Sequence, residues 1–189
     1  QSCHYVNENY IESYQKKYQK ALNNIKKDVS LENVEIVNPQ LSSRKNGYRT
    51  SIKLAVRKSF EKTNKYKNTI RAQSSFPKKT PTEKKEIFEI GLFQPGSHKL
   101  ISIEGCLVHH KNINRLIKSV KTLLNESELT PYCEKTGQGD IRYLLVRMSH
   151  ISEEFMVTFV TTNKACYPTL RSFIKKLKLT YNITSSFLN

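Results

Sequence analysis

The chain has 189 residues, 37% of them hydrophobic, and carries 32 Lys and Arg residues against 16 Asp and Glu residues. This length suits one domain with appended segments better than two complete domains. No apolar run approaches the roughly 18 residues that a membrane helix needs, and no signal-peptide core is visible, so we expect a cytoplasmic protein without a membrane partner. The four cysteines are widely spaced, which in this setting argues against disulfides.

The positive charge is concentrated in one part of the sequence. Residues 44–86 contain fourteen Lys or Arg residues and three Glu residues, which accounts for eleven of the sixteen net positive charges. A concentrated basic patch gives strong, salt-dependent binding to phosphate backbones. The alternatives are a merely soluble basic surface or one that faces anionic lipid, but the clustering favours a nucleic-acid partner.

An amphipathic helix is predicted near the start of the chain. Tyr10, Tyr14, Tyr18, Leu22 and Ile25 recur at helical spacing between residues 8 and about 27. We interpret this aromatic stripe as part of a core rather than as a platform on which bases stack.

A strand and a long basic loop are predicted next. Between residues 48 and 57 apolar side chains alternate with polar ones, which indicates a strand with one buried face and one basic face that carries Lys53 and Arg57. Residues 58–85 have no sustained period, hold two prolines and are rich in lysine. They predict a flexible basic loop between two strands.

The second half of the sequence alternates between strand and helix patterns. The expected elements are strands 87–93 and 100–103 around a Gln-Pro-Gly-Ser turn, a helix ending near residue 125, strands 141–148 and 155–161, a helix beginning near Pro168, and a strand-like segment 181–189. This order predicts an α+β fold, an antiparallel sheet flanked by helices, with the long basic loop between two of its strands.

Gly137 and Gly139 have a spacing that occurs in cofactor-binding loops. Such a loop lies between a buried strand and the N-terminus of a helix, so that backbone N–H groups meet a phosphate. Here a strand pattern follows the glycines instead. We therefore predict a turn.

Other candidate catalytic and metal-binding residues lack a suitable context. Cys133 and Cys166 show no sequence context for a general base or a shaped pocket, so we interpret them as structural or incidental. His109 and His110 precede the second predicted helix without the spacing of zinc ligands, which favours a surface or capping role.

A series of short motifs resembles the middle region of the RNA uracil-C5 methyltransferase family, which includes the bacterial 23S ribosomal RNA and transfer RNA m5U enzymes. The motifs are Tyr48-Arg49, Ile90 to His98, Ile101 to Cys106 and Gly139 to Arg147. The resemblance implies a helical segment 1–47 after a cysteine motif, an RNA-binding domain 48–180 with the flexible insertion 58–85, and the start of a methyltransferase domain at 181–189. The chain begins with Gln1, so we expect a part of a longer protein.

This family transfers a methyl group from S-adenosylmethionine to uracil C5, with a cysteine nucleophile and a carboxylate base in the domain that follows this region. The resemblance therefore implies that the chain holds RNA, expected to be ribosomal RNA, as a monomer and without catalytic residues of its own. The expected RNA-binding residues are Arg49, Lys53, Arg57, Phe93, His98, Arg142 and Arg147. The alternative is a stand-alone basic RNA-binding or ribosome-associated module without enzymatic activity.

The resemblance also implies an iron–sulfur cluster. Many members of the family bind a 4Fe-4S cluster through three nearby cysteines and a fourth far downstream. By motif position, Cys3 is the last of the three and Cys106 is the fourth. The chain departs from the pattern because Gln1 and Ser2 stand where two glycines are expected, and the other two cysteines would precede residue 1.

Overall fold

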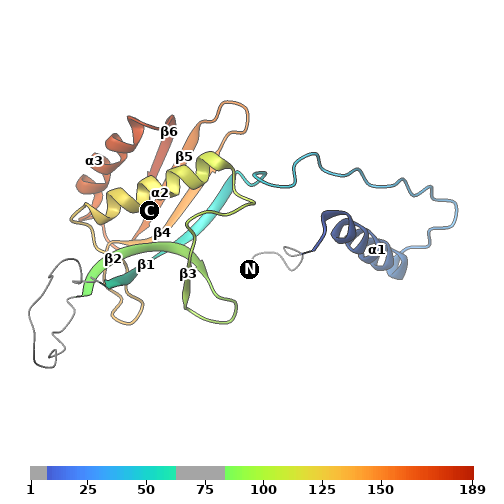
Figure 1. The fold of residues 1–189 in the computed structure, drawn as a ribbon, viewed down its shortest axis with the longest axis horizontal. Helices are drawn as coiled ribbons and strands as arrows, with labels where there is room; N and C mark the ends of the chain where they lie inside the picture. The colour runs from blue at the N-terminus through green and yellow to red at the C-terminus, as the bar shows by residue number, and fades with distance from the viewer. Residues whose placement is uncertain (1–7, 63–83) are drawn as a thin grey trace, which may run out of the picture.

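The computed structural model describes residues 8–62 and 84–189, which form one sheet and three helices (Figure 1). The helices are α1 (Tyr10–Asp28), α2 (Lys111–Asn125) and α3 (Tyr167–Lys178), and the strands are β1 (Ser51–Lys62), β2 (Lys84–Phe93), β3 (Leu100–Ser102), β4 (Ile141–Met148), β5 (Phe155–Thr161) and β6 (Ile183–Leu188). The prediction of a mixed fold with helices flanking a sheet is confirmed. None of the helices in the described ranges is long and apolar enough to cross a membrane.

The six strands lie in the order β3-β2-β1-β4-β5-β6. Every neighbouring pair is antiparallel except β5 and β6, which run parallel. The sheet is therefore mostly antiparallel, and the expectation of a wholly antiparallel sheet is corrected at this edge. The reason is α3, because a helix between two strands returns the chain to the end of the sheet from which it started, and this makes the strands parallel. Segment 181–189, predicted to begin another domain, supplies β6 to this sheet.

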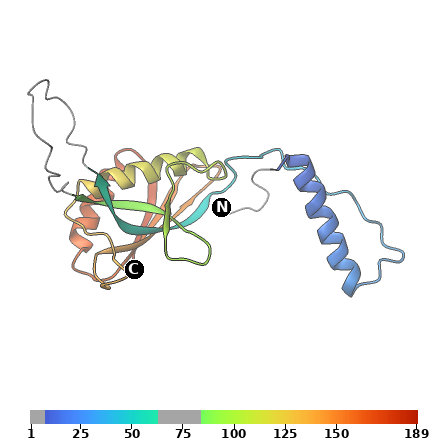
Figure 2. The ribbon, with the colours of Figure 1, turned by 60° about the horizontal axis from the view of Figure 1, so that its bottom comes forward.

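The hydrophobic core lies between the sheet and the two helices α2 and α3, which cover the same face (Figure 2). Alternate residues of β1, β4 and β5 point into this core, and the helices contribute apolar side chains at helical spacing. The fully buried side chains include Leu54, Ile90, Leu116, Leu144, Phe159 and Leu170. In the described part of the chain no helix covers the other face of the sheet (Figures 1 and 2).

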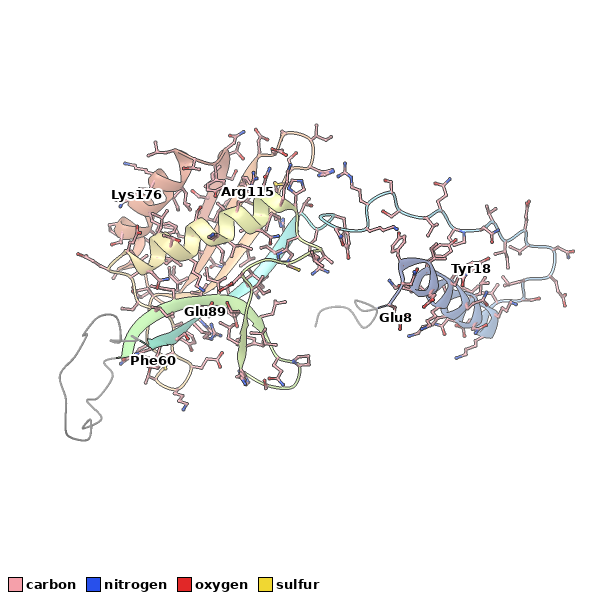
Figure 3. The ribbon with its side chains drawn as sticks, in the orientation of Figure 1. Glu8, Tyr18, Phe60, Glu89, Arg115 and Lys176 are labelled. Atoms are coloured by element: carbon pink, nitrogen blue, oxygen red, sulfur yellow. The ribbon has the colours of Figure 1, made fainter. Side chains whose placement is uncertain are left out.

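Both ends of the predicted basic loop are strand in the structure. Residues 58–62 continue β1 and residues 84–85 begin β2, with Lys62 paired to Lys84. The strands extend beyond the core, where side chains such as Phe60 are exposed, so the sequence carries no alternation there (Figure 3). The rest of the predicted loop, residues 63–83, lies outside the described residues.

Helix α1 forms as predicted, but its aromatic stripe is not part of the core. Figures 1 and 3 show the helix, with Tyr18, set apart from the sheet. The hydroxyl of Tyr10 donates to the carbonyl of Ser42 at 3.3 Å, and that of Tyr14 donates to the carbonyl of Pro39 at 2.5 Å. The interpretation as core was wrong because the tyrosines face the connecting segment 29–47 rather than the sheet.

Close approach of β2 and β3 depends on a glycine. A Cβ atom at Gly91 would lie 1.9 Å from the carbonyl oxygen of Ile101, whereas a Cβ atom at Gly105 would meet nothing within 4 Å. We therefore expect Gly91→Ala to destabilise the fold by about 1–3 kcal/mol in urea unfolding, since overpacking displaces β3. The matched Gly105→Ala should change the free energy of unfolding by less than about 0.5 kcal/mol. Equal effects of the two substitutions would contradict this account of the sheet edge.

Candidate nucleic-acid interface

Arg57 of β1 is a buried cation near the middle of the sheet. It lies on the same strand face as Lys53, as predicted, but neighbouring side chains leave only 9% of its side chain exposed. Its Nη1 donates to the carbonyl oxygens of Val56 at 2.8 Å and of Arg142 at 2.9 Å, and its Nη2 forms an ion pair with Glu134 Oε1 at 2.5 Å. Arg57 thus joins β1 to β4 and to the turn that precedes β4.

Aromatic rings from three parts of the chain surround this guanidinium group. Its carbon lies 5.0 Å from the ring centre of Phe93, 5.2 Å from that of Tyr132 and 5.3 Å from that of Tyr143. The guanidinium of Arg142 lies over Tyr132 and Tyr143 at 4.7 and 5.8 Å. These distances suit cation–π attraction, which holds the rings and the cations in place together.

Exposed cations border these rings. Lys53 Nζ lies 4.7 Å from the ring centre of Tyr143. His98, 85% exposed, lies 5.9 Å from the ring of Phe93, and its Nδ1 is 2.9 Å from Glu134 Oε2, which makes an ion pair when the imidazole is protonated. We call the whole group the Arg57 cluster. It consists of Lys53, Arg57, Phe93, His98, Tyr132, Glu134, Arg142 and Tyr143.

Glu134 stays ionised within this cluster. The hydrogen bond from Arg57 holds the pKa of this carboxyl below its ordinary value, against the opposing effect of partial desolvation, and the charges of Arg57 and His98 lower it further. The charge of the ionised Glu134 carboxylate therefore compensates the charge of the buried Arg57 guanidinium group. The cationic groups that remain without a carboxylate partner in the cluster are Lys53, over the ring of Tyr143, and Arg142, over that of Tyr132.

The structure thus brings together five of the seven residues predicted to bind RNA: Lys53, Arg57, Phe93, His98 and Arg142. Arg147 is opposite Ser51 in the β1–β4 pair, so its exposed side chain shares the uncovered face with Lys53 and Tyr143. Arg49 lies before β1, where its backbone pairs with that of His109, and it does not join the cluster.

Sequence reasoning missed Tyr132, Glu134 and Tyr143. Tyr143 lies inside the motif Gly139 to Arg147, and its alternation with Leu144 gave a usable signal for the open face. Tyr132 and Glu134 belong to a turn, where no periodicity indicates the direction of a side chain.

The uncovered face continues across β5 and β6 as a more apolar surface. A hollow of about 180 Å³ there is lined by Leu145, Arg147, Met156 and Thr158. Phe187 of β6, paired with Thr158, is half exposed. Exposed or half-exposed rings therefore lie toward both sides of this face, with cations between them.

The remaining motifs have structural roles. Residues 133–138 form a turn closed by the hydrogen bond from Cys133 N to Gln138 O at 2.8 Å, and Gly137 has φ +68°, so the predicted turn is confirmed. His110 caps α2, because its Nδ1 accepts from Asn112 N at 3.3 Å. His109 is buried, so the predicted surface or capping role was wrong for this residue.

The predicted iron–sulfur cluster has one of its expected ligands, Cys106, within the described residues. These residues include no group of three or more His, Cys, Asp or Glu side chains that could hold a metal ion. Cys106 is half-buried, and its backbone exchanges hydrogen bonds with the side chain of Asn114 at 3.0 and 3.3 Å. Cys106, Cys133 and Cys166 are free thiols, while Cys3 lies outside the described residues.

The chain is similar in sequence to bacterial proteins named as uncharacterized RNA methyltransferases. The protein of Listeria innocua is 32% identical over 52% of this chain, that of Staphylococcus epidermidis 37% over 51%, and that of Streptococcus agalactiae 40% over 39%. These matches span 22%, 21% and 16% of the relatives, so the chain covers about a fifth of their length. No family model matches the chain.

A solved structure has a similar fold. It is Pyrococcus abyssi tRNA (uracil-54, C5)-methyltransferase in complex with S-adenosyl-L-homocysteine, with a TM-score of 0.51 and 24% identity over 82% of this chain and 29% of that one. The named relatives confirm the resemblance to RNA methyltransferases that the motifs indicate, and the solved structure shows that the fold is shared.

The ion pair at the centre of the cluster gives a pH-dependent prediction. Because the pKa of Glu134 is lower in the folded chain, its contribution to stability is present above the ordinary glutamate pKa and is lost as the pH falls through the folded value. Glu134→Gln should lower the free energy of unfolding at pH 7 and flatten its fall between about pH 5 and 3. Denaturant titrations at several pH values measure this.

Glu126→Gln is the matched control, since Glu126 is exposed at the end of α2. It should leave the pH profile of the wild type unchanged. A Glu134→Gln profile that runs parallel to the wild type at all pH values would contradict the assigned role of the pair.

Proposed function

We propose that this chain is the RNA-binding central region of an S-adenosylmethionine-dependent RNA (uracil-C5) methyltransferase that acts on ribosomal RNA. The observation that carries the proposal is the Arg57 cluster, an arrangement of half-exposed rings and cations on the uncovered face of the sheet. The names of the relatives support RNA methylation, and the S-adenosyl-L-homocysteine bound to the structural neighbour supports this methyl donor. We assign the transfer step itself to parts of the longer protein beyond this chain.

The open face suits unpaired RNA better than a duplex. Bases in loops and single strands expose their ring faces, and a sheet that carries aromatic side chains can stack them. Tyr143, Phe93 and Phe187 offer such rings, while Lys53 and Arg147 lie between them at positions where they can contact phosphates. A duplex would present only its phosphates and groove edges to this face.

Arg57 takes a different role from the one expected of it. A guanidinium that is 9% exposed and already bonded to Glu134 and two carbonyl groups cannot reach a phosphate without breaking those bonds. It acts as a positioning residue, because it fixes the rings and the backbone of Arg142, and these contact the RNA. Arg142 remains half-exposed, with its guanidinium group over the ring of Tyr132.

The proposal also includes ribosomal RNA as the substrate, a monomeric state and a cytoplasmic location. We propose ribosomal RNA because the motifs resemble those of bacterial enzymes that methylate it. The free thiols of the described cysteines agree with a reducing compartment.

RNA binding by the open face is tested with two substitutions and one control. Tyr143→Ala should weaken binding of a short unpaired RNA by roughly 5- to 150-fold, because stacking contributes about 1–3 kcal/mol per base. Lys53→Gln should reduce the slope of log K against log salt by about 0.7, the value for one phosphate on a single strand. Fluorescence anisotropy at several salt concentrations measures both.

The control is Lys176→Gln, on the exposed side of α3 and away from the uncovered face (Figure 3). It should change the affinity by less than twofold. If Lys176→Gln weakened RNA binding as much as Lys53→Gln does, RNA would bind through general charge rather than at this face. That result would contradict the proposal.

The enzymatic part is tested with the longer protein that contains this chain. Incubated with ribosomal RNA and methyl-labelled S-adenosylmethionine, it should form 5-methyluridine. The variant that combines Tyr143→Ala and Lys53→Gln should react more slowly because its KM for RNA is higher. A protein that binds the RNA but transfers no methyl group would instead support the stand-alone binding module.

A further inference from the structure

A second concave site lies near the start of β1, apart from the Arg57 cluster. It is a pocket of about 840 Å³ formed by the segment before β1, the N-terminus of α2 and the β4–β5 turn. The residues that matter for its chemistry are Arg44, His109, His110, Lys111, His150 and Ile151. Three segments far apart in the sequence thus converge here.

The pocket wall is rich in cationic and imidazole groups. Arg44 Nη1 lies 3.4 Å from His150 Nδ1, and the rings of His110 and His150 meet edge to face with their centres 5.7 Å apart. Lys111 opens α2, a helix of 15 residues, so its charge adds to the positive end of the helix dipole. Glu153 is the one carboxylate among the lining residues.

His109 is a buried imidazole in the wall of the pocket. It lines the pocket and is only 4% exposed, and its Nδ1 has no hydrogen-bond partner among the described residues. Burial, and then the charge of Arg49, lower the pKa of this imidazole, so it is neutral near pH 7. A hydrogen bond with the side chain of Asn114 on α2 opposes part of this shift and holds the ring in the wall.

Backbone hydrogen bonds hold the pocket open in advance. Gly47 N donates to Leu107 O at 2.8 Å, and Arg49 N donates to Val108 O at 2.8 Å. His110 N donates to Arg49 O at 3.0 Å. The segment before β1 is therefore fixed against the start of α2, and a ligand would not have to order this wall.

The pocket also has apolar surface at its mouth. Ile151 is 97% exposed and Leu107 is largely exposed, and both belong to the lining. A volume of this order lies in the range of small-ligand sites, which combine apolar walls with a few polar groups. Cations beside exposed apolar side chains and imidazole rings match a ligand that is both anionic and planar.

We propose that this pocket binds one unpaired ribonucleotide, with its phosphate at Arg44 and Lys111 and its base against His150 and Ile151. The inference rests on the proposed function, because the nucleotide is a part of the same RNA. Eight residues of extended chain separate Arg49 from Arg57, which places the pocket roughly 26 Å from the centre of the Arg57 cluster. The pocket is thus a second point of contact that fixes the direction of the RNA strand on the sheet.

The test uses uridine 5′-monophosphate and inorganic phosphate as separate probes of the isotope-labelled chain by NMR. Uridine 5′-monophosphate should cause saturable shifts in the amide signals of residues 106–111 and 150–153, and phosphate alone should bind at least fivefold more weakly. Arg44→Ala and His150→Ala should each weaken nucleotide binding at least fivefold. Both side chains belong to exposed residues, so circular dichroism should show an intact fold.

Arg115→Ala is the matched control, because Arg115 is exposed on α2, one turn beyond Lys111, and does not line the pocket (Figure 3). It should bind the nucleotide as the wild type does. Absent or unsaturable shifts, or equal binding to Arg44→Ala and wild type, would overturn the inference. Equal affinity for phosphate and nucleotide would also overturn it, since the pocket would then recognise an anion only.

The two proposals can fail separately. If Arg44→Ala leaves RNA affinity unchanged while Tyr143→Ala lowers it, the pocket is not an RNA contact and the open face remains one. If neither substitution affects RNA affinity, both proposals fail. A loss of at least fivefold for each, with Arg115→Ala unchanged, supports both.

Discussion

A buried guanidinium group is the constraint on which the open face of this molecule depends. Arg57 is removed from water, so its charge must be paired and its N–H groups bonded, or the fold would bear a large desolvation cost. Most of this need is met by Glu134, two carbonyl groups and three rings. The Nε of Arg57 alone among its nitrogens has no hydrogen-bond partner in the described part of the chain. Because the partners come from β1, β2, β4 and the turn before β4, satisfying one charge also fixes the rings that face solvent.

The two faces of the sheet divide stability from recognition. The helices α2 and α3 bury the apolar residues of one face, which frees the other face from packing. That face can therefore carry half-exposed rings and cations, which a core would exclude. The proposed pocket extends the same division, since it lies where the end of the sheet meets the start of α2 and uses side chains that the core does not need.

Much of the fold could be predicted from the sequence, because α2, α3 and the β4–β5 hairpin bury one face and so show a clear period. The direction of β6 could not be predicted, since the sequence pattern of a strand is the same in parallel and antiparallel pairs. The burial of Arg57 was not predicted because it stands at a polar position of the alternating strand pattern. Its partner Glu134 is 77 residues away in the sequence. Phe93 and His98 came from family motifs rather than from periodicity, and Tyr132 had no local signal.

The central proposal is that unpaired RNA lies across the uncovered face of the sheet. The most direct measurement is photocrosslinking with short RNAs that contain 4-thiouridine, followed by mass spectrometry of the crosslinked peptides. We expect crosslinks to peptides that contain Phe93, Tyr143 or Phe187, with few to the exposed side of α3. Crosslinks concentrated on α3, or distributed evenly over the lysine-containing peptides, would contradict this proposal.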